Sequence, residues 1–312
     1  MTASPVDAAL LAQAPFARWL ARELARFERC AEAALPAADR APRRLHQAIR
    51  YAALGGGKRV RPLLVYSAGE CARPGGPTAV LDSVALAVEF VHVYSLIHDD
   101  LPCMDDDVLR RGRPTVHVAF DEATAMLAGD ALQAEAFRVL ADAPAPGEVR
   151  AALMGELARA IGTDGMCGGQ AIDLDSIGRS LDLDELEAMH RKKTGALLLA
   201  AVRMGALAAG INAPTLPALD RYGRAIGLAF QIVDDVLDVE GTSEVLGKTA
   251  GKDAQRNKPT YVSVLGLSPA RERAEWLRRD ALAALDEIEG VVNPVRTLRL
   301  RQLADFIVLR SH

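Results

Sequence analysis

Hydrophobic positions along the chain recur mainly at intervals of three and four residues, the spacing of an amphipathic helix. Residues 15–35, PFARWLARELARFERCAEAAL, keep this spacing throughout. Residues 194–211, TGALLLAAVRMGALAAGI, are apolar on nearly every side, which predicts a helix at the centre of a bundle. Strictly alternating runs are few while alanine and leucine are abundant, so we expect helices to dominate.

Glycine and proline interrupt the helical pattern at intervals, and none of these interruptions is long enough to link independently folded domains. They are residues 54–58, 72–77, 143–147, 162–169 and 211–217. We therefore expect an all-α fold, a single-domain bundle of roughly ten or more helices over residues 1–312. Residues 1–40 are expected to form an N-terminal helix.

Composition narrows the function classes. Half of the residues are hydrophobic and the net charge is −4, which does not favour a nucleic-acid-binding protein. The N-terminus lacks the basic segment of a signal peptide, and the apolar runs 84–97 and 196–211 fall short of a membrane span. Four cysteines occur without a CxxC pair, which favours a reducing compartment. We expect a cytoplasmic protein without a membrane span.

An acidic cluster follows one of the apolar segments directly. Residues 99–107, DDLPCMDDD, place five aspartates within nine positions. Such a cluster is either a solvated loop or a cation site, because neighbouring carboxylates repel one another. Asp99 and Asp105, six apart, would lie about 240° apart on an ideal helix. Pro102 must therefore bend or end the helix if the two carboxylates are to meet.

A second acidic cluster, FQIVDDVLDV at residues 230–239, makes the cation site the better interpretation. Asp234 and Asp238 are four apart and share one helix face. Asp235 points about 100° away, so we expect it to lie behind the cation ligands and to support them. Carboxylate oxygens without softer ligands suit Mg²⁺, which completes its coordination with water and substrate phosphates. An EF-hand is excluded because no glycine stands at the sixth loop position after Asp99 or Asp105.

A glycine-rich basic segment, LGGGKRVRP at residues 54–62, is a candidate diphosphate site. It is not a nucleotide-binding P-loop, because Ala52 and Arg59 occupy positions that the GxxxxGK[ST] motif reserves for glycine and for serine or threonine. Lys58 and Arg61 are three apart, so we expect them on one face of the helix that follows the glycines.

These residues resemble the trans-prenyltransferase family, the short-chain isoprenyl diphosphate synthases, from about residue 40 to the C-terminus. The motifs that carry the resemblance occur in the family order: GGGKRVRP, HDDLPCMDDDVLRRGRPTVH, GMCGGQAIDL, KKTGALL, FQIVDDVLDV, GKTAGKD and NKPTY. The DDxxxxD spacing of the first acidic motif is similar to that of bacterial farnesyl diphosphate synthases. Val262 departs from the pattern, since relatives often have proline there. The resemblance implies an all-α bundle of the isoprenoid synthase type with a central active-site cavity.

The resemblance also implies the metal ligands and the clamp on the allylic diphosphate. Asp99 and Asp105 would bind two Mg²⁺ ions and Asp234 a third, with support from Asp238. About three ions are thus expected for each active site. The side chains in contact with the diphosphate of dimethylallyl or geranyl diphosphate would be Arg110, Lys193, Lys248 and Lys258.

Isopentenyl diphosphate would be the second substrate in this resemblance. Thr194 and Gln231 would lie beside the allylic cation that forms when diphosphate leaves. Isopentenyl diphosphate then attacks to form a 1′-4 bond, and the released diphosphate takes the final proton. The residues implied to hold isopentenyl diphosphate are Gly57, Lys58, Arg61, His92 and Arg111.

Tyr94 and Ser95 lie about one helical turn before Asp99, where a growing prenyl chain would reach. A tyrosine at this level resembles the floor of enzymes that stop at fifteen carbons, so the expected product is (2E,6E)-farnesyl diphosphate. Tyr94 could instead pack only within the core. His46, His98 and His117 are assigned structural roles.

Other functions stay open at this point. The product could be geranyl or geranylgeranyl diphosphate, and the chain could be a non-catalytic regulatory subunit, although such subunits typically lose one acidic motif. A terpene cyclase would have no use for an isopentenyl diphosphate clamp. Members of the family commonly form homodimers, so we expect a homodimer that binds small-molecule substrates and no nucleic acid.

Overall fold

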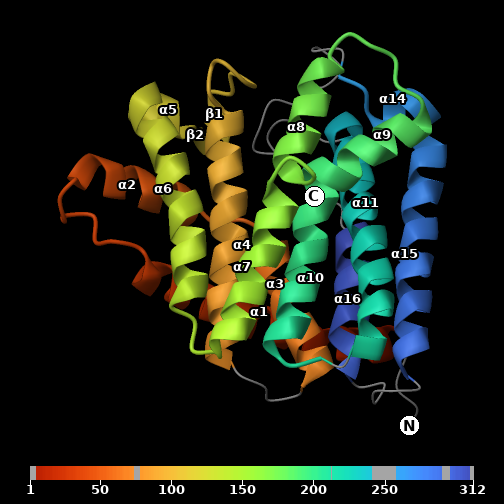
Figure 1. Ribbon diagram of the computed structural model, residues 1–312. Coiled ribbons are helices and arrows are strands. Elements are labelled where there is room, and N and C mark those ends of the chain that lie inside the picture. Colours follow the sequence, from red (N-terminus) through yellow and green to blue (C-terminus); the bar gives the residue numbers. More distant parts are fainter. Residues whose placement is uncertain (1–4, 74–77, 212, 241–257, 290–295, 310–312) are drawn as a thin grey trace.

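The long helices lie side by side in an upright bundle, as Figure 1 shows. The computed structural model of the protein describes residues 5–73, 78–211, 213–240, 258–289 and 296–309. Helices account for nearly all of its regular structure, so the all-α prediction is confirmed. The elements of the first half are α1 (Pro5–Ala34), α2 (Arg43–Ala53), α3 (Val60–Ala72), α4 (Thr78–Asp99), α5 (Val116–Ala119), α6 (Glu122–Ala141) and α7 (Gly147–Ile161).

The second half continues the bundle and closes one end of it with short elements. They are α8 (Met166–Asp175), α9 (Leu183–His190), the π-helix η1 (Arg191–Gly195), α10 (Ala196–Ala208), the 3-10 turn η2 (Ala213–Thr215), α11 (Leu216–Glu240), α14 (Tyr261–Leu265), α15 (Leu267–Glu289) and α16 (Leu298–Val308). The described residues hold one small antiparallel hairpin, β1 (Leu109–Arg110) with β2 (Arg113–Pro114).

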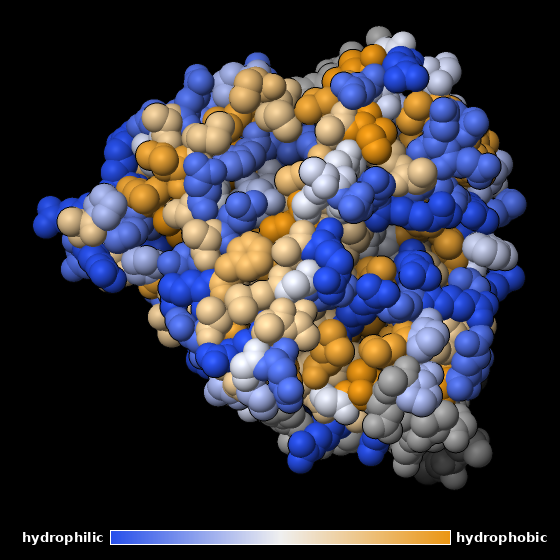
Figure 2. Space-filling view, viewed as in Figure 1, coloured by the Kyte–Doolittle hydropathy of each residue, from blue (hydrophilic) through white to orange (hydrophobic). Residues whose placement is uncertain are grey.

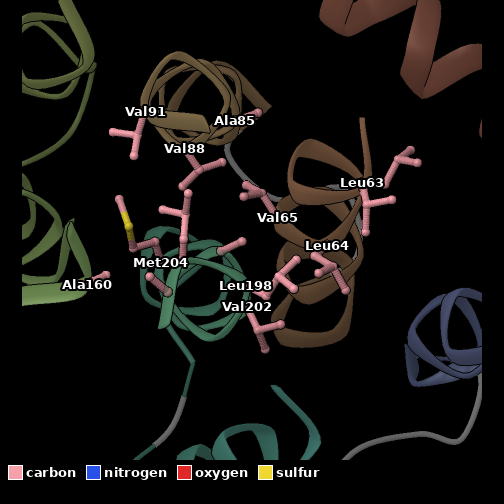
Figure 3. Packing of buried hydrophobic residues seen from close by; sticks show 14 of the residues in the cluster. Leu63, Leu64, Val65, Ala85, Val88, Val91, Ala160, Leu198, Val202 and Met204 are labelled. Carbon is pink, nitrogen blue, oxygen red and sulfur yellow. The ribbon is translucent and has the colours of Figure 1, made fainter. Parts of the chain in front are cut away.

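Part of the core lies where α3, α4 and α10 meet, and Figure 3 shows side chains from all three helices interdigitating there. Val65 of α3, Val88 of α4 and Val202 of α10 are each fully buried. The predicted apolar segment 194–211 thus becomes η1 and α10 at the centre of the bundle, as expected from its lack of a polar face.

Helix α4 is longer than the apolar run 84–97 that the sequence suggested, and this expectation needs correction. By length and composition alone, its 22 residues are enough to cross a membrane. However, 72% of its most apolar window is buried within the bundle. A helix packed on all sides needs an apolar surface all round, so core packing explains the composition.

Glycine lets two central helices approach closely. A Cβ on Gly205 of α10 would lie 2.4 Å from the carbonyl oxygen of Val65 on α3, closer than real Cβ contacts. Gly155 on α7 is also within a helix, but a Cβ there would meet only the end of the Arg159 side chain, 3.6 Å away.

We expect Gly205→Ala to lower the free energy of unfolding by about 1–3 kcal/mol, because the backbone of α3 cannot move aside freely. The matched variant Gly155→Ala should be neutral or more stable by up to about 1 kcal/mol, since alanine favours the helix. Urea unfolding followed by circular dichroism measures both. Equal effects of the two variants would contradict a close α3–α10 contact.

Candidate active site

The two acidic motifs lie at the same end of the bundle, because α4 and α11 both finish there (Figure 1). A cavity of about 870 Å³ opens beside them and extends down between the helices. Of the residues selected from the sequence, the structure brings thirteen to its wall: Gly57, Lys58, Arg61, His92, Tyr94, Ser95, Asp99, Arg110, Arg111, Lys193, Thr194, Gln231 and Asp234.

Among the residues that the structure describes, three of those selected do not line this cavity. Asp105, Asp238 and Lys258 lie outside the group of residues that form its wall, and Asp238 is 5% exposed. Lys248 lies outside the described residues. The wall therefore holds two of the four expected metal ligands, Asp99 and Asp234.

The backbone after Asp99 makes the turn that the sequence required. Helix α4 ends at Asp99, and the amide of Asp105 donates to the carbonyl of Asp99 at 2.8 Å. Two further bonds, from Asp106 to the carbonyl of Leu101 and from Asp107 to that of Asp100, complete the turn. The residues around Pro102 thus end the helix and return Asp105 towards Asp99, as predicted.

Asp99 lies where its charge is poorly solvated. Burial raises its pKa to about 6; Lys193 acts against this shift, while the carboxylate of Asp105 adds to it. Within the described part of the chain, no three His, Cys, Asp or Glu side chains come close enough to form a metal cage. An oxygen-only donor set of this kind fits Mg²⁺, which keeps water and substrate phosphates among its ligands.

Asp100 has a different role from its neighbour. It is 3% exposed and accepts from two nitrogens of Arg110, from Nε at 2.8 and 3.0 Å and from Nη2 at 2.6 Å. This two-point contact fixes the guanidinium plane at the cavity wall. Asp100 therefore supports a predicted diphosphate-binding residue.

The glycine-rich turn differs from the expectation in one respect. Helix α3 begins at Val60, and Arg59 has a left-handed backbone with φ of 49°, so Lys58 precedes the helix. The prediction that Lys58 and Arg61 share a helix face is wrong, because the positive φ angles of Gly56, Gly57 and Arg59 turn the chain before the helix starts. Both side chains still reach the cavity wall.

Gly57 also makes room for a cation. A Cβ at this position would lie 2.7 Å from the guanidinium carbon of Arg111, whose Nη1 donates to the carbonyl of Gly56. His92 stands near this group. Burial and the nearby positive charges, above all Arg61, hold the pKa of His92 well below its usual range, so its imidazole is neutral.

A chain of alternating charges connects α8, η1 and the first acidic motif. Lys193 donates to Asp173 at 2.5 Å, and Lys258 lies 3.5 Å from the same carboxylate and 2.8 Å from Asp105. Although burial alone would raise the pKa of Asp173, the two lysines hold it below its usual value. These ion pairs hold two predicted diphosphate-binding lysines, Lys193 and Lys258, beside the first acidic motif.

Asp173 is the functional residue that we did not select from the sequence. It lies within GMCGGQAIDL, a motif that carried the family resemblance without a role for this carboxylate. The same motif contained an expected turn at residues 162–169, but α8 already begins at Met166. Gly169 lies within α8, and a Cβ there would be 2.1 Å from the backbone nitrogen of Lys193, so the glycine allows α8 and η1 to touch.

A second chain of hydrogen bonds orients the polar groups in the middle of the cavity. Thr194 donates to Oε1 of Gln231, and Nε2 of Gln231 donates to Asp235, each at 2.8 Å. The backbone amide of Tyr261 donates to the other oxygen of Asp235, also at 2.8 Å. Asp235 thus lies behind the cavity wall, as its position on the helix predicted, and fixes Gln231.

The deeper wall is mostly apolar. Tyr94 is 5% exposed, and its ring lies edge-on to that of His98, with centroids 5.8 Å apart. His98 is in turn in contact with the carbonyl of Met126 on α6, at 3.0 Å. It thus has the expected packing role, although it also lines the cavity. The apolar side chains at this depth and along the wall include Met104, Met166, Ala171, Leu174, Phe230 and Leu237.

Comparisons with known proteins agree with this arrangement. The family model described as polyprenyl synthetase matches residues 42–293. Farnesyl diphosphate synthase of Escherichia coli is 53% identical over 270 residues, covering 85% of this chain and 89% of that protein.

Two solved structures extend the comparison to three dimensions. An FPP/GFPP synthase from Zymomonas mobilis is 39% identical with a TM-score of 0.82, covering 95% of this chain and 99% of that one. A geranyltransferase from Helicobacter pylori, in complex with magnesium and isoprenyl diphosphate, is 34% identical with a TM-score of 0.82. The aligned region is 94% of this chain and 96% of that one.

Proposed function

Because the chain belongs to the polyprenyl synthetase family, we propose that it condenses isopentenyl diphosphate with dimethylallyl diphosphate and then with geranyl diphosphate. The product is (2E,6E)-farnesyl diphosphate, and each 1′-4 head-to-tail condensation releases diphosphate. The observation that carries this proposal is the cavity itself, which joins two acidic motifs and a basic clamp to an apolar interior. The function of the Escherichia coli relative supports it.

Mg²⁺ is the proposed cofactor, held by Asp99, Asp105 and Asp234 with support from Asp238. When bound, the metal supplies positive charge that favours departure of the allylic diphosphate. The magnesium in the complex of the Helicobacter pylori geranyltransferase supports this choice of ion. Asp105 is paired with Lys258 at 2.8 Å, so a metal bound by Asp105 would share this carboxylate with a cation of the chain.

The proposed role of the basic residues is to hold the leaving diphosphate. Lys193 and Arg110 each have a carboxylate partner that fixes the direction of the charged group, Asp173 for the lysine and Asp100 for the arginine. Lys248 and Lys258 complete this set. Charges fixed in advance stabilise the departing diphosphate more than the bound substrate, which is how they accelerate the step.

Isopentenyl diphosphate would bind at the glycine-rich turn. The residues proposed to hold it, which all line the cavity, are Gly57, Lys58, Arg61, His92 and Arg111. A neutral His92 can donate one hydrogen bond to a phosphate oxygen without adding a further positive charge to the three cations.

Thr194 and Gln231 are the residues proposed to lie beside the allylic cation. Since the Thr194 hydroxyl donates its proton to Gln231, its oxygen lone pairs remain available to positive charge in the cavity. No side chain need act as a nucleophile. The released diphosphate takes the proton that is lost in the last step.

The enzyme is proposed to be cytoplasmic. All four cysteines, Cys30, Cys71, Cys103 and Cys167, are free thiols, as expected for a reducing compartment. No nucleic acid or other macromolecule is required by the proposed reaction.

We expect the purified protein with Mg²⁺ and both five-carbon diphosphates to form a fifteen-carbon diphosphate, detected by mass spectrometry.

Asp99→Asn should lower the rate by more than about a hundredfold, because it removes charge from the metal site. The control Asp106→Asn changes an exposed aspartate in the same turn, with φ of 45°, a conformation that asparagine tolerates. Its rate should stay within about twofold. Absence of any condensation by the unaltered protein would refute the proposed function.

The length of the product tests Tyr94 as the floor of the cavity. Tyr94→Ala should give products of twenty carbons or more, because it opens the wall about one turn below Asp99. Tyr94→Phe keeps the ring and should still stop at fifteen carbons. Chromatography of the dephosphorylated products distinguishes these outcomes, and a fifteen-carbon product from Tyr94→Ala would show that another residue limits the chain.

We propose that the expected homodimer forms through α5 and α6. Val118, Met126 and Leu127 are exposed by 50%, 42% and 56%, and Figure 2 shows apolar side chains gathered over these helices. An apolar area of this kind on a folded protein marks an interaction surface. A two-fold axis would bring it against its own copy.

Leu127→Glu should shift the protein from dimer to monomer, because it would bury a charge in the contact. Leu309→Glu alters a leucine of 67% exposure at the end of α16 and should leave the mass unchanged. Sedimentation velocity measures the mass of both variants. A Leu127→Glu dimer as stable as the unaltered one would place the interface elsewhere.

A further inference from the structure

Arg59 is the one residue of the glycine-rich turn with a fully buried charge. Its side chain is 0% exposed, although it carries the N-cap position of α3 next to a cavity for anions. Its backbone is left-handed, with φ of 49°, a conformation that is unfavourable for a residue with a Cβ. A strained, buried cation inside a substrate-binding turn must be held by its surroundings.

Three helices meet at this guanidinium, and a fourth, α3, begins at the backbone of the same residue. Nε donates to Glu28 of α1 at 2.8 Å, and Nη1 donates to Glu89 of α4 at 2.9 Å. Nη2 donates to the carbonyl of Ala53, the last residue of α2, at 2.7 Å. The backbone carbonyl of Arg59 accepts from Leu63 within α3. These bonds fix the turn between α2 and α3 from both sides.

The neighbours of Arg59 in the chain are the residues proposed to hold isopentenyl diphosphate. Gly57 and Lys58 come directly before it and Arg61 two residues after, and all three line the cavity. A change in the backbone of Arg59 would rotate Lys58 relative to Arg61, because the left-handed residue sets the direction in which the chain enters α3. The position of one side chain therefore decides the geometry of the clamp.

Arg59 also compensates a charge that would oppose an anionic substrate. Glu89 lines the cavity and is 2% exposed. Burial lowers the pKa of Arg59, but Glu89 and Glu28 outweigh this effect and the pKa is raised. Glu89 is thus a carboxylate already neutralised by a fixed cation. Without that cation it would repel a diphosphate or draw Arg61 away from it.

We propose that Arg59 is a positioning residue for isopentenyl diphosphate and that Glu28 of α1 is its anchor. This inference rests on the proposed function. It gives α1 a part in substrate binding, although α1 ends at Ala34, before residues 42–293 that the family model matches. Arg59 and Glu28 act through Lys58 and Arg61 and need not touch the substrate themselves.

The decisive measurement is calorimetric binding of isopentenyl diphosphate to the full chain without an allylic substrate, so that no turnover takes place. Arg59→Lys keeps the positive charge but loses the planar guanidinium that bonds Glu28, Glu89 and Ala53 together. This variant should bind isopentenyl diphosphate about tenfold more weakly, equivalent to about 1.4 kcal/mol. Glu28→Gln should weaken binding in the same direction. In steady-state assays KM for isopentenyl diphosphate should rise, while KM for geranyl diphosphate stays within about twofold.

Glu32→Gln is the matched control. Glu32 lies one turn further along α1 and pairs with Arg50 of α2, so this variant breaks the same kind of ion pair without touching Arg59. Its affinity for isopentenyl diphosphate should be unchanged. In the Arg59→Lys variant, adding Glu28→Gln should lower the affinity for isopentenyl diphosphate little further, because both changes act on one interaction.

The possible failures are distinct. If the unaltered protein condenses the substrates but Arg59→Lys and Glu28→Gln bind isopentenyl diphosphate normally, the inference is wrong and the proposed function stands. An equal rise of both KM values together with a lower Tm would also overturn it, since that is the result of a general loss of structure. If the unaltered protein neither binds isopentenyl diphosphate nor condenses it, both proposals fail.

Discussion

Charges taken out of water need partners of opposite sign, and this requirement governs the end of the bundle where the cavity opens. Several of the cations there are held by carboxylates that are not among the proposed metal ligands. Asp100 holds Arg110, Asp173 holds Lys193 at 2.5 Å and lies near Lys258, and Glu89 with Glu28 holds Arg59. These pairs keep the side chains charged and fixed in direction. A site for two diphosphates needs both properties, because flexible cations would pay their ordering entropy only when the substrate arrives.

Close helix packing makes this arrangement of charges possible. Glycine replaces larger residues at the points where backbones meet, as at Gly169 against Lys193 and Gly227 against Gly195. Both contacts involve the π-helix η1, whose wider turn directs Lys193 and Thr194 into the cavity from one short segment. The scaffold and the site are therefore not separable here, since the same backbone contacts set the distance between α8, η1 and α11.

The cavity wall contains both charged and apolar side chains, which match the two parts of a prenyl diphosphate. Its wall combines charged side chains with apolar ones such as Met166, Leu174 and Phe230, so a diphosphate and a hydrocarbon chain each meet a matching surface. Thr194, Gln231 and Asp235 form a directed series of hydrogen bonds that ends at a backbone amide. Fixed dipoles of this kind suit a cationic intermediate, because they need no reorganisation when the charge appears. The FPP/GFPP synthase from Zymomonas mobilis has the same fold.

Local patterns in the chain were enough to determine the helices, the two acidic motifs and the basic turn. Helical periodicity, the spacing of Asp234 from Asp235 and the need for a bend at Pro102 are properties of neighbouring residues, and each agrees with the structure. Only the tertiary structure decided which charged side chains form ion pairs with one another. Lys258 and Asp105 are 153 positions apart, and Arg59 and Glu28 are 31 apart. Periodicity carries no information over such separations, because the contact depends on how whole helices pack. The prediction that Lys58 and Arg61 share a helix face was wrong for the same reason. The left-handed Arg59, which places Lys58 before the helix, is held by residues of α1 and α4.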